Sequence, residues 1–199
     1  MSRLLINIRG CNGSGKSTIP IEMLKKDKEA QVIRKLYNGK EKVIAHVSPK
    51  YKSVILGSYF NKTGGLDTFP NNEFTKKVLK YCIKHYPEYD ILMEGIIAST
   101  IYSTYRDLFK SVEKRYCITP VIINFIPPLN IAINRIYQRN CGKLINEDAV
   151  ENKWNIVKRN HFKFKDDGFI SLIVDTNLCK KQEMLGNFLD IIDEIKERL

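Results

Sequence analysis

Short, nearly continuous apolar runs alternate along the chain with longer segments in which apolar residues recur every three or four positions. The apolar runs predict buried strands at residues 3–8, 90–94, 119–126 and 169–175. The segments with helical spacing predict helices at residues 16–26, 72–85, 96–114, 128–139, 147–165 and about 185–195. Strands that alternate with helices predict an α/β fold, in which helices cover both faces of a mostly parallel sheet.

The segment 31–70 departs from this alternation. It contains three short predicted strands at 31–37, 42–48 and 53–58, joined by turns at Asn38-Gly39 and Pro49-Lys50. We expect a small β excursion here, within one domain that spans residues 1–199, because 199 residues is an ordinary size for a single domain.

Composition narrows the class of protein. No apolar run approaches the ~18 residues of a membrane span and the apolar start is too short for a secretory signal, so we expect a cytoplasmic protein without a membrane partner. The five cysteines are scattered, which predicts neither a disulfide framework nor a zinc ribbon. The net charge is +11, and residues 1–65 alone carry 13 basic and 4 acidic residues, or +9. This excess is typical of proteins that contact polyanions such as nucleic acid.

One motif carries a specific chemistry. The sequence Gly10-Cys11-Asn12-Gly13-Ser14-Gly15-Lys16-Ser17 fits the P-loop pattern and stands between a predicted strand and a predicted helix. In such a loop the backbone amides surround a nucleotide phosphate, the lysine neutralises the β and γ oxygens, and the hydroxyl ligates Mg²⁺. The motif therefore predicts ATP and Mg²⁺ as cofactors. The expected cofactor-binding residues in the loop are Asn12, Gly13, Ser14, Gly15, Lys16, Ser17 and Thr18, and Lys16 is also expected to be catalytic.

Two further groups are expected beside the P-loop. Glu94 ends a predicted strand, where sheets of this kind place reactive carboxylates, so we expect it to hold Mg²⁺ with Ser17; a solvated strand end is the alternative. Arg135 and Arg139 share one helix face, and Lys143 follows. These three predict a lid at 135–146 that closes over a triphosphate, with both arginines catalytic. A solvated basic helix face is the alternative.

A loop rich in glycine forms the candidate acceptor site. Gly57 and Tyr59 are followed by Gly64-Gly65-Leu66-Asp67-Thr68. Asp67 is a candidate for the general base that accepts the proton of an attacking hydroxyl, although a carboxylate in such a loop also suits a turn or a helix cap. The expected substrate-binding residues are Tyr59, Gly64, Gly65, Asp67, Thr68, Glu94 and Arg106.

Together these motifs resemble one family, the phage P-loop kinases that act on 5-hydroxymethyluracil in DNA and that are related to thymidylate kinase and polynucleotide kinase. The resemblance covers residues 3–160. It rests on Asn7-Ile8-Arg9-Gly10 before the P-loop, the glycine-rich acceptor loop, Met93-Glu94-Gly95, and the lid residues Arg135, Arg139, Gly142 and Lys143. It implies a P-loop NTPase fold of the nucleotide-kinase type, with a helical lid.

The resemblance also implies a function. ATP would phosphorylate the hydroxymethyl group of the base in phage DNA, in the cytoplasm of an infected bacterium. The basic hairpins on either side of residues 57–68 would then contact DNA phosphates, and the base would leave the stack to reach Asp67. Tyr59, Phe60 and Tyr105 are the candidates for a stacking surface.

Two alternatives stay open on the sequence alone. In a deoxynucleoside or deoxynucleoside monophosphate kinase, Asp67 and Arg106 would bind a free nucleotide. Thymidylate kinases usually have an Asp-Arg pair where this chain has Glu94-Gly95, which counts against that relative. A DNA-binding switch that binds ATP without phosphate transfer is the third class. If Asp67 is structural, Glu94 becomes the candidate base.

Overall fold

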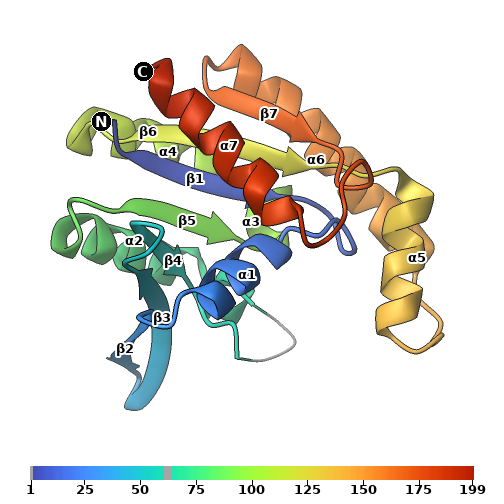
Figure 1. Cartoon of the computed structure of the whole chain (residues 1–199), viewed down its shortest axis with the longest axis horizontal. Helices are drawn as coiled ribbons and strands as arrows, with labels where there is room; N and C mark the ends of the chain where they lie inside the picture. The colour runs from blue at the N-terminus through green and yellow to red at the C-terminus, as the bar shows by residue number, and fades with distance from the viewer. Residues whose placement is uncertain (1, 61–63) are drawn as a thin grey trace.

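A computed structural model of the chain describes residues 2–60 and 64–199; residues 61–63 of the expected excursion lie outside the described residues. One seven-stranded sheet runs through the molecule in the order β2-β3-β4-β5-β1-β6-β7 (Figure 1). Its strands are β1 (Leu4–Arg9), β2 (Gln31–Tyr37), β3 (Lys40–Ser48), β4 (Ser53–Leu56), β5 (Asp90–Glu94), β6 (Thr119–Phe125) and β7 (Ile170–Val174). The strands from β4 to β7 in this order are parallel, whereas β2 and β3 are antiparallel additions.

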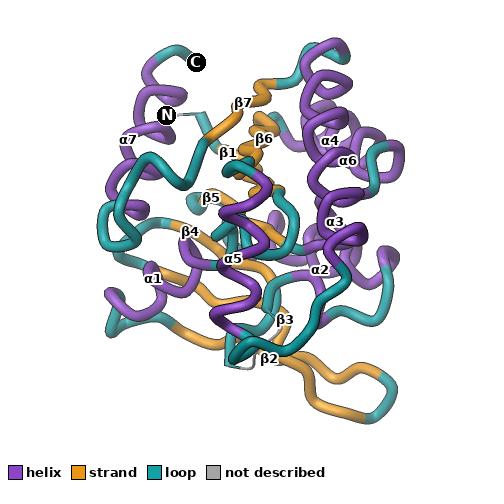
Figure 2. Tube along the Cα trace, turned by 90° about the vertical axis from the view of Figure 1, so that its right-hand side faces the viewer, coloured by secondary structure: helices purple, strands orange, loops and turns teal. Residues whose placement is uncertain are grey.

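Helices cover both faces of the sheet, as the alternation predicts. Figure 2 shows α1 and α7 on one face and α2, α3, α4 and α6 on the other. Their bounds are α1 (Thr18–Lys26), α2 (Asn72–His85), α3 (Ile96–Thr100), α4 (Ser103–Tyr116), α5 (Leu129–Arg139), α6 (Glu147–Asp166) and α7 (Met184–Glu197). The predicted three-layer α/β architecture is confirmed. No helix in the described ranges is both long and apolar enough to cross a bilayer.

The central strands are buried on both faces, which explains their continuous apolar sequences. Leu5 and Ile122 point into a core shared with α2 and α4, while Ile6 and Ile123 point into a second core beneath α1 and α7. All four side chains have at most 3% of their surface exposed. Burial of each stabilises the fold by roughly 1.5–3 kcal/mol, so the sheet is held from both sides.

The order of the strands places the P-loop at a particular edge. The strand β1 lies between β5 and β6, and the sheet continues from β1 in both directions, with β4 beyond β5 and β7 beyond β6. In parallel sheets this switch point opens a crevice beyond the carboxyl ends of the strands, where ligands bind. The P-loop leaves β1 there, and α5 stands in front of the same edge (Figure 2).

The prediction of one helix over 96–114 is wrong. The helix divides into α3 and α4, and Ile101 between them is extended, with ψ 122°. The buried guanidinium of Arg9 donates to the carbonyl oxygens of Ser99 at 2.6 Å and Ile101 at 3.0 Å. These carbonyls would bond within a continuous helix. Arg9 from β1 therefore fixes the break.

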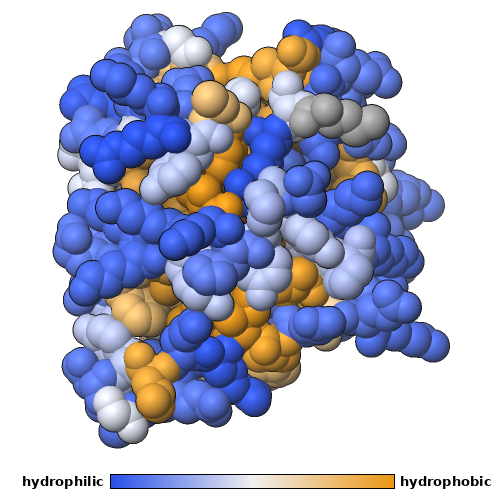
Figure 3. Space-filling view, turned by 90° about the vertical axis from the view of Figure 1, so that its left-hand side faces the viewer, coloured by the Kyte–Doolittle hydropathy of each residue, from blue (hydrophilic) through white to orange (hydrophobic). Residues whose placement is uncertain are grey.

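The expected β excursion is continuous with the main sheet, because β4 pairs directly with β5. Asn38 and Gly39 form the tight turn between β2 and β3, with positive φ angles of 51° and 73°. This turn lies at the carboxyl end of β4, whereas the turn at residues 49–52, between β3 and β4, lies at the amino end. The expectation that both basic hairpins flank the acceptor loop is therefore wrong for the second. Figure 3 faces the end where the parallel strands begin, and hydrophilic side chains cover most of it.

Candidate active site at the carboxyl end of the sheet

The P-loop forms a compact cradle between β1 and α1. Gly13 and Gly15 have φ angles of 77° and 88°, which side chains rarely allow. Gly13 also lies against α5, where a Cβ atom would stand 2.1 Å from the carbonyl oxygen of Ala132. Lys16 is 7% exposed and its Nζ lies 3.4 Å from the Cys11 carbonyl oxygen. The ammonium thus folds back over its own loop, where a phosphate would lie.

Glu94 stands beside the P-loop, as its position at the end of β5 predicts. Its Oε2 accepts a hydrogen bond from Ser17 Oγ at 3.1 Å, whereas its Oε1 is buried with no hydrogen-bond partner among the described residues. Burial raises the pKa of Glu94, the charge of Lys16 opposes this, and Asp67 adds to it. A buried carboxylate with a free oxygen is suited to holding a proton or a cation.

The glycines of the acceptor loop let it lie directly on Glu94. A Cβ on Gly57 would meet the carbonyl oxygen of Gly65 at 2.1 Å, and a Cβ on Gly65 would meet Oε1 of Glu94 at 2.5 Å. The loop is closed by a β-bridge between Ser58 and Gly65 and by Thr68, whose Oγ1 donates to the Gly65 carbonyl oxygen at 2.7 Å. The motif therefore brings the loop against the carboxyl edge of the sheet, and the contacts of Thr68 hold the loop closed.

Asp67 points at the start of α3. Its Oδ1 accepts hydrogen bonds from the backbone amides of Ile96 and Ile97, at 3.0 and 3.2 Å, and its Oδ2 accepts from Ile96 at 2.9 Å. This is the capping arrangement that the sequence left open as the alternative for an Asp in this loop. It fixes the exit of the chain from β5, just beyond Glu94.

Of the three candidate stacking rings, one offers an exposed face. Tyr105 is buried, 2% exposed, and Tyr59 is half-buried against the second core, whereas Phe60 is 63% exposed. The Phe60 ring lies 5.3 Å from the buried ring of His46, and the Tyr59 ring lies 6.0 Å from it. Burial, and then the negative charge of Glu94, raise the pKa of the Tyr59 hydroxyl. Gly64 packs against the Tyr59 ring.

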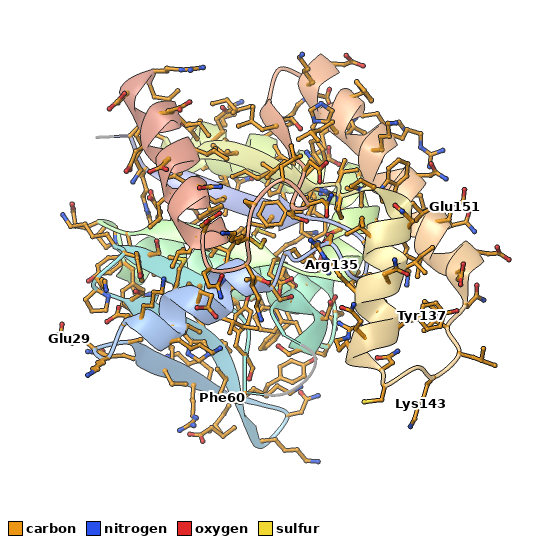
Figure 4. The ribbon with its side chains drawn as sticks, turned by 45° about the vertical axis from the view of Figure 1, so that its right-hand side comes forward. Glu29, Phe60, Arg135, Tyr137, Lys143 and Glu151 are labelled. Atoms are coloured by element: carbon orange, nitrogen blue, oxygen red, sulfur yellow. The ribbon has the colours of Figure 1, made fainter. Side chains whose placement is uncertain are left out.

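The expected lid residues take different positions. Arg135 points from α5 toward the P-loop (Figure 4), where it donates to Thr176 Oγ1 at 2.8 Å and to the Gly13 carbonyl oxygen at 3.4 Å. Arg139 is exposed on the last turn of α5. Lys143 lies on the loop beyond α5, at the far end of the helix from the P-loop (Figure 4). The structure therefore brings Arg135 to the phosphate cradle but not Lys143.

Arg106 is not brought to this edge. Its guanidinium donates to Asp107 at 2.8 Å and lies 5.8 Å from the Tyr102 ring. Hydrogen bonding to Asp107 and its charge raise the pKa of Arg106, and Asp167 contributes. The residue therefore belongs to a surface cluster on α4 rather than to the acceptor loop.

The sequence left three residues of this region unassigned. Thr176 Oγ1 donates to the Ser14 carbonyl oxygen at 2.8 Å, joining the loop after β7 to the P-loop. Its signal was a polar residue just past a predicted strand, the same signal that found Glu94. Arg9 stands between the apolar run 3–8 and Gly10, and that position does not predict that its guanidinium is buried. Nothing in the sequence marked His46, whose Nε2 is buried without a partner among the described residues.

The residues present fit both expected cofactors. The P-loop leaves Ser14 Oγ and Asn12 Oδ1 buried without partners among the described residues, and Lys16 and Arg135 supply positive charge beside them. Mg²⁺ is commonly held by one or two oxygen side chains together with phosphates and water, which matches Ser17 and Glu94. An apolar hollow of about 170 Å³ next to Thr176 offers room beside the loop.

The sheet order and this cradle place the chain in the class of P-loop proteins with a nucleotide-kinase type of fold. The family model for 5-hmdU DNA kinase matches residues 3–179. The chain belongs to the 5-hmdU DNA kinase family, so the family resemblance predicted from the sequence is confirmed.

Two curated relatives carry the family name. The 5-hmdU DNA kinase of Bacillus phage SP10 is 44% identical over 193 residues, which cover 95% of this chain and 29% of the relative. The 5-hmdU DNA kinase 1 of Salmonella phage ViI is 33% identical over 155 residues, which cover 77% of this chain and 67% of the relative. The chain thus spans under a third of the first relative's length.

A solved structure is also similar. It is the deoxyadenosine kinase of M. mycoides with bound dATP, which is 17% identical, with a TM-score of 0.45. The match covers 96% of this chain and all of the other.

Proposed function

We propose that this chain is a kinase that transfers phosphate from ATP to the hydroxymethyl group of 5-hydroxymethyluracil in phage DNA, within the infected bacterial cell. One observation carries the proposal: Glu94 lies between the P-loop and the acceptor loop. Its Oε2 faces Ser17 and its Oε1 faces Gly65. The family name and the basic charge of residues 1–65 support DNA as the acceptor.

The phosphate side binds the donor. Lys16 and the loop amides surround the β and γ phosphates, and Arg135 adds positive charge through its position beside Gly13. Ser17 and Glu94 would hold Mg²⁺, which would supply positive charge against the phosphate oxygens. Arg139 and Lys143, exposed on the lid segment 135–146, reach the nucleotide only if that segment closes.

Glu94 is our candidate for the general base. The hydroxymethyl oxygen attacks the γ-phosphorus, its proton passes to Oε1 of Glu94, and the bond to ADP breaks. The products are ADP and a phosphate monoester on the base. Oε1 has no hydrogen-bond partner among the described residues, and burial raises the pKa of Glu94, which makes the carboxylate a better proton acceptor. Asp67 already accepts three backbone hydrogen bonds, so we assign it to positioning.

Phe60 is our candidate for the surface on which the displaced base stacks. Its ring is exposed, it rests on His46, and it follows Tyr59, which is next to Glu94 in space. Stacking on an aromatic ring contributes roughly 1–3 kcal/mol per base. A Phe60→Ala variant should therefore weaken use of the modified DNA about tenfold or more, while a Phe60→Tyr variant keeps it.

The first test is transfer of label from radioactive ATP with Mg²⁺. Four acceptors are compared: duplex DNA with 5-hydroxymethyluracil, the same duplex with thymine, the free deoxynucleosides and their monophosphates. Label on the hydroxymethylated DNA alone supports the proposal. Label on a free nucleoside or nucleotide overturns it in favour of a nucleotide-pool kinase. ATP binding without transfer to any acceptor overturns it in favour of a DNA-binding switch.

A further inference from the structure

Part of the β2–β3 hairpin projects beyond the sheet on the side of the active site. Pairing of β3 with β4 ends at Ala45, and the last contact is the bond from Gly57 N to the Ile44 carbonyl oxygen, at 2.9 Å. Residues 34–43 continue past this point as a two-stranded ribbon, which stands out from the body in Figure 2. From Ala45 to Lys40 the strand advances about 17 Å. We call residues 34–43 the ribbon.

The two faces of the ribbon differ. On one face Lys35 lies 4.3 Å from the Tyr81 ring of α2, and Tyr37 packs edge-on against Phe74 with ring centroids 4.7 Å apart. Leu36 alternates with these residues and so points to the opposite face. The first face is therefore fastened to the protein, and the second is open.

The open face carries an apolar side chain among charges. Leu36 is 78% exposed and pairs with Glu41, which forms an ion pair with Arg34 at 3.8 Å. Arg34, Lys35, Lys40 and Lys42 against Glu41 give the ribbon a charge of 4 − 1, or +3. Arg34 shares the open face with Leu36, whereas Lys35, Lys40 and Lys42 belong to the opposite face. The charge of Arg34 also reaches His46, beneath the exposed ring of Phe60. The open face thus leads from Leu36 toward the acceptor loop.

We propose that the tip of the ribbon enters a DNA duplex beside the target base, with Leu36 on one face as a wedge and the lysines of the opposite face bound to flanking phosphates. The inference rests on the proposed function, because a base inside a duplex must leave the stack before it reaches Glu94. Proteins that open base steps use apolar side chains on cationic elements for this purpose. The tight Asn38-Gly39 turn and the contacts of Lys35 and Tyr37 keep the ribbon rigid, so the cost of unstacking is met by binding to phosphates.

The test compares Leu36→Ala with Leu36→Met, which keeps the apolar length. The matched control is Leu199→Ala, because Leu199 is another exposed leucine, at the chain end far from the ribbon (Figure 1). Each variant is assayed on one hydroxymethylated sequence, offered as a duplex and as a single strand. We expect Leu36→Ala to lower kcat/KM about tenfold on the duplex and to leave the single strand unchanged. Leu36→Met and Leu199→Ala should match the wild type on both.

A second readout does not depend on phosphate transfer. A 2-aminopurine next to the target base brightens when that step unstacks, so its fluorescence is measured on binding without ATP. The wild type should brighten it and Leu36→Ala should not. A wild type that brightens the probe but transfers no phosphate overturns the proposed function and keeps the wedge. Four outcomes overturn the wedge. In Leu36→Ala they are an equal loss of kcat/KM on duplex and single strand, an unchanged kcat/KM on the duplex, or a changed oligomeric mass. In the wild type it is a probe that does not brighten.

Discussion

The two sides of the active-site edge are built differently. On the phosphate side, hydrogen bonds join the P-loop to its neighbours: Arg135 bonds to Thr176 and Gly13, and Thr176 bonds to Ser14. Only the loop atoms Ser14 Oγ and Asn12 Oδ1 are buried there without a partner among the described residues. On the acceptor side, buried polar atoms of Tyr59, His46 and Glu94 have no partner among the described residues. Large apolar side chains, Phe60 and Leu36, are exposed there.

Under the proposed function, this difference reflects the two ligands. A nucleotide triphosphate is small and constant, so a site for it can be largely preorganised from the protein's own bonds. A base in a polymer arrives with a duplex around it, and its partners complete the site only when it binds. Buried polar atoms without partners cost stability, and they persist where a ligand uses them.

The largest effect should come from the residue between the two sides. We expect Glu94→Gln to lower kcat by about 10²- to 10⁴-fold, because a general base contributes that much. Asp67→Asn should lower kcat less than tenfold and reduce the free energy of unfolding by about 1 kcal/mol, as expected for a helix cap. Turnover rates and denaturant unfolding curves of both variants test the assignment. The opposite order would make Asp67 the base and leave Glu94 only its proposed role as a cation ligand.

The pH profile distinguishes these roles further. A base acts in its deprotonated form, so activity is lost as pH falls through its pKa. Because burial raises the pKa of Glu94, the acid limb of kcat/KM should lie above the value of 4.5 of an ordinary glutamate. An acid limb at or below that value would exclude Glu94.

The Lys16→Ala variant tests the role of the phosphate side without changing the acceptor side. Loss of one charge that stabilises the transferred group costs about 10²- to 10³-fold in kcat. We expect that loss together with weaker ATP binding, and unchanged binding of DNA without ATP, measured by fluorescence anisotropy. The control is Lys25→Ala, which changes an exposed lysine on α1, the helix that follows the P-loop. Wild-type turnover in Lys16→Ala would remove the phosphate-loop mechanism.

The sequence predicted what is local and missed what depends on distant partners. The P-loop, the position of Glu94 and most helices could be predicted, because sequence motifs and the spacing of apolar residues are local patterns that span only a few positions. The end of α3 was missed because Arg9, about 90 positions away, binds its carbonyls. The capping contacts of Asp67 come from amides 29 and 30 positions away. The order and direction of the strands, which place the two basic hairpins at opposite ends of the sheet, likewise cannot be predicted from local sequence patterns.

The pKa of His46 tests whether this part of the acceptor side is buried when no ligand is bound. Burial, and then Arg34, lower the pKa of His46 to about 4, from an ordinary value of 6.5. Below pH 6.5 His46 is protonated in the unfolded chain but stays neutral in the folded chain. His46 therefore makes the free energy of unfolding fall as pH drops from 6.5 toward 4. The loss reaches at most about 3 kcal/mol. We expect His46→Phe to flatten the decline in unfolding free energy across this window, and the exposed His85→Asn to leave it unchanged. Parallel declines in wild type and His46→Phe would contradict the burial of this ring.

The smallest effect concerns the charges of the acceptor side, and it separates location from total charge. Lys40→Gln with Lys42→Gln removes two ribbon charges, and Lys50→Gln with Lys52→Gln removes two at the opposite end of the sheet. Removal of one cation that binds a DNA phosphate reduces the slope of log K against log salt by about 0.9, so the ribbon pair should reduce it by about 1.8. The other pair should leave the slope unchanged, as measured by anisotropy of labelled duplex across a salt series. Because both variants have the same net charge, equal slopes would mean that DNA responds to overall charge. The acceptor side would then have no electrostatic surface of its own, and its contrast with the phosphate side would rest on Phe60 and Leu36 alone.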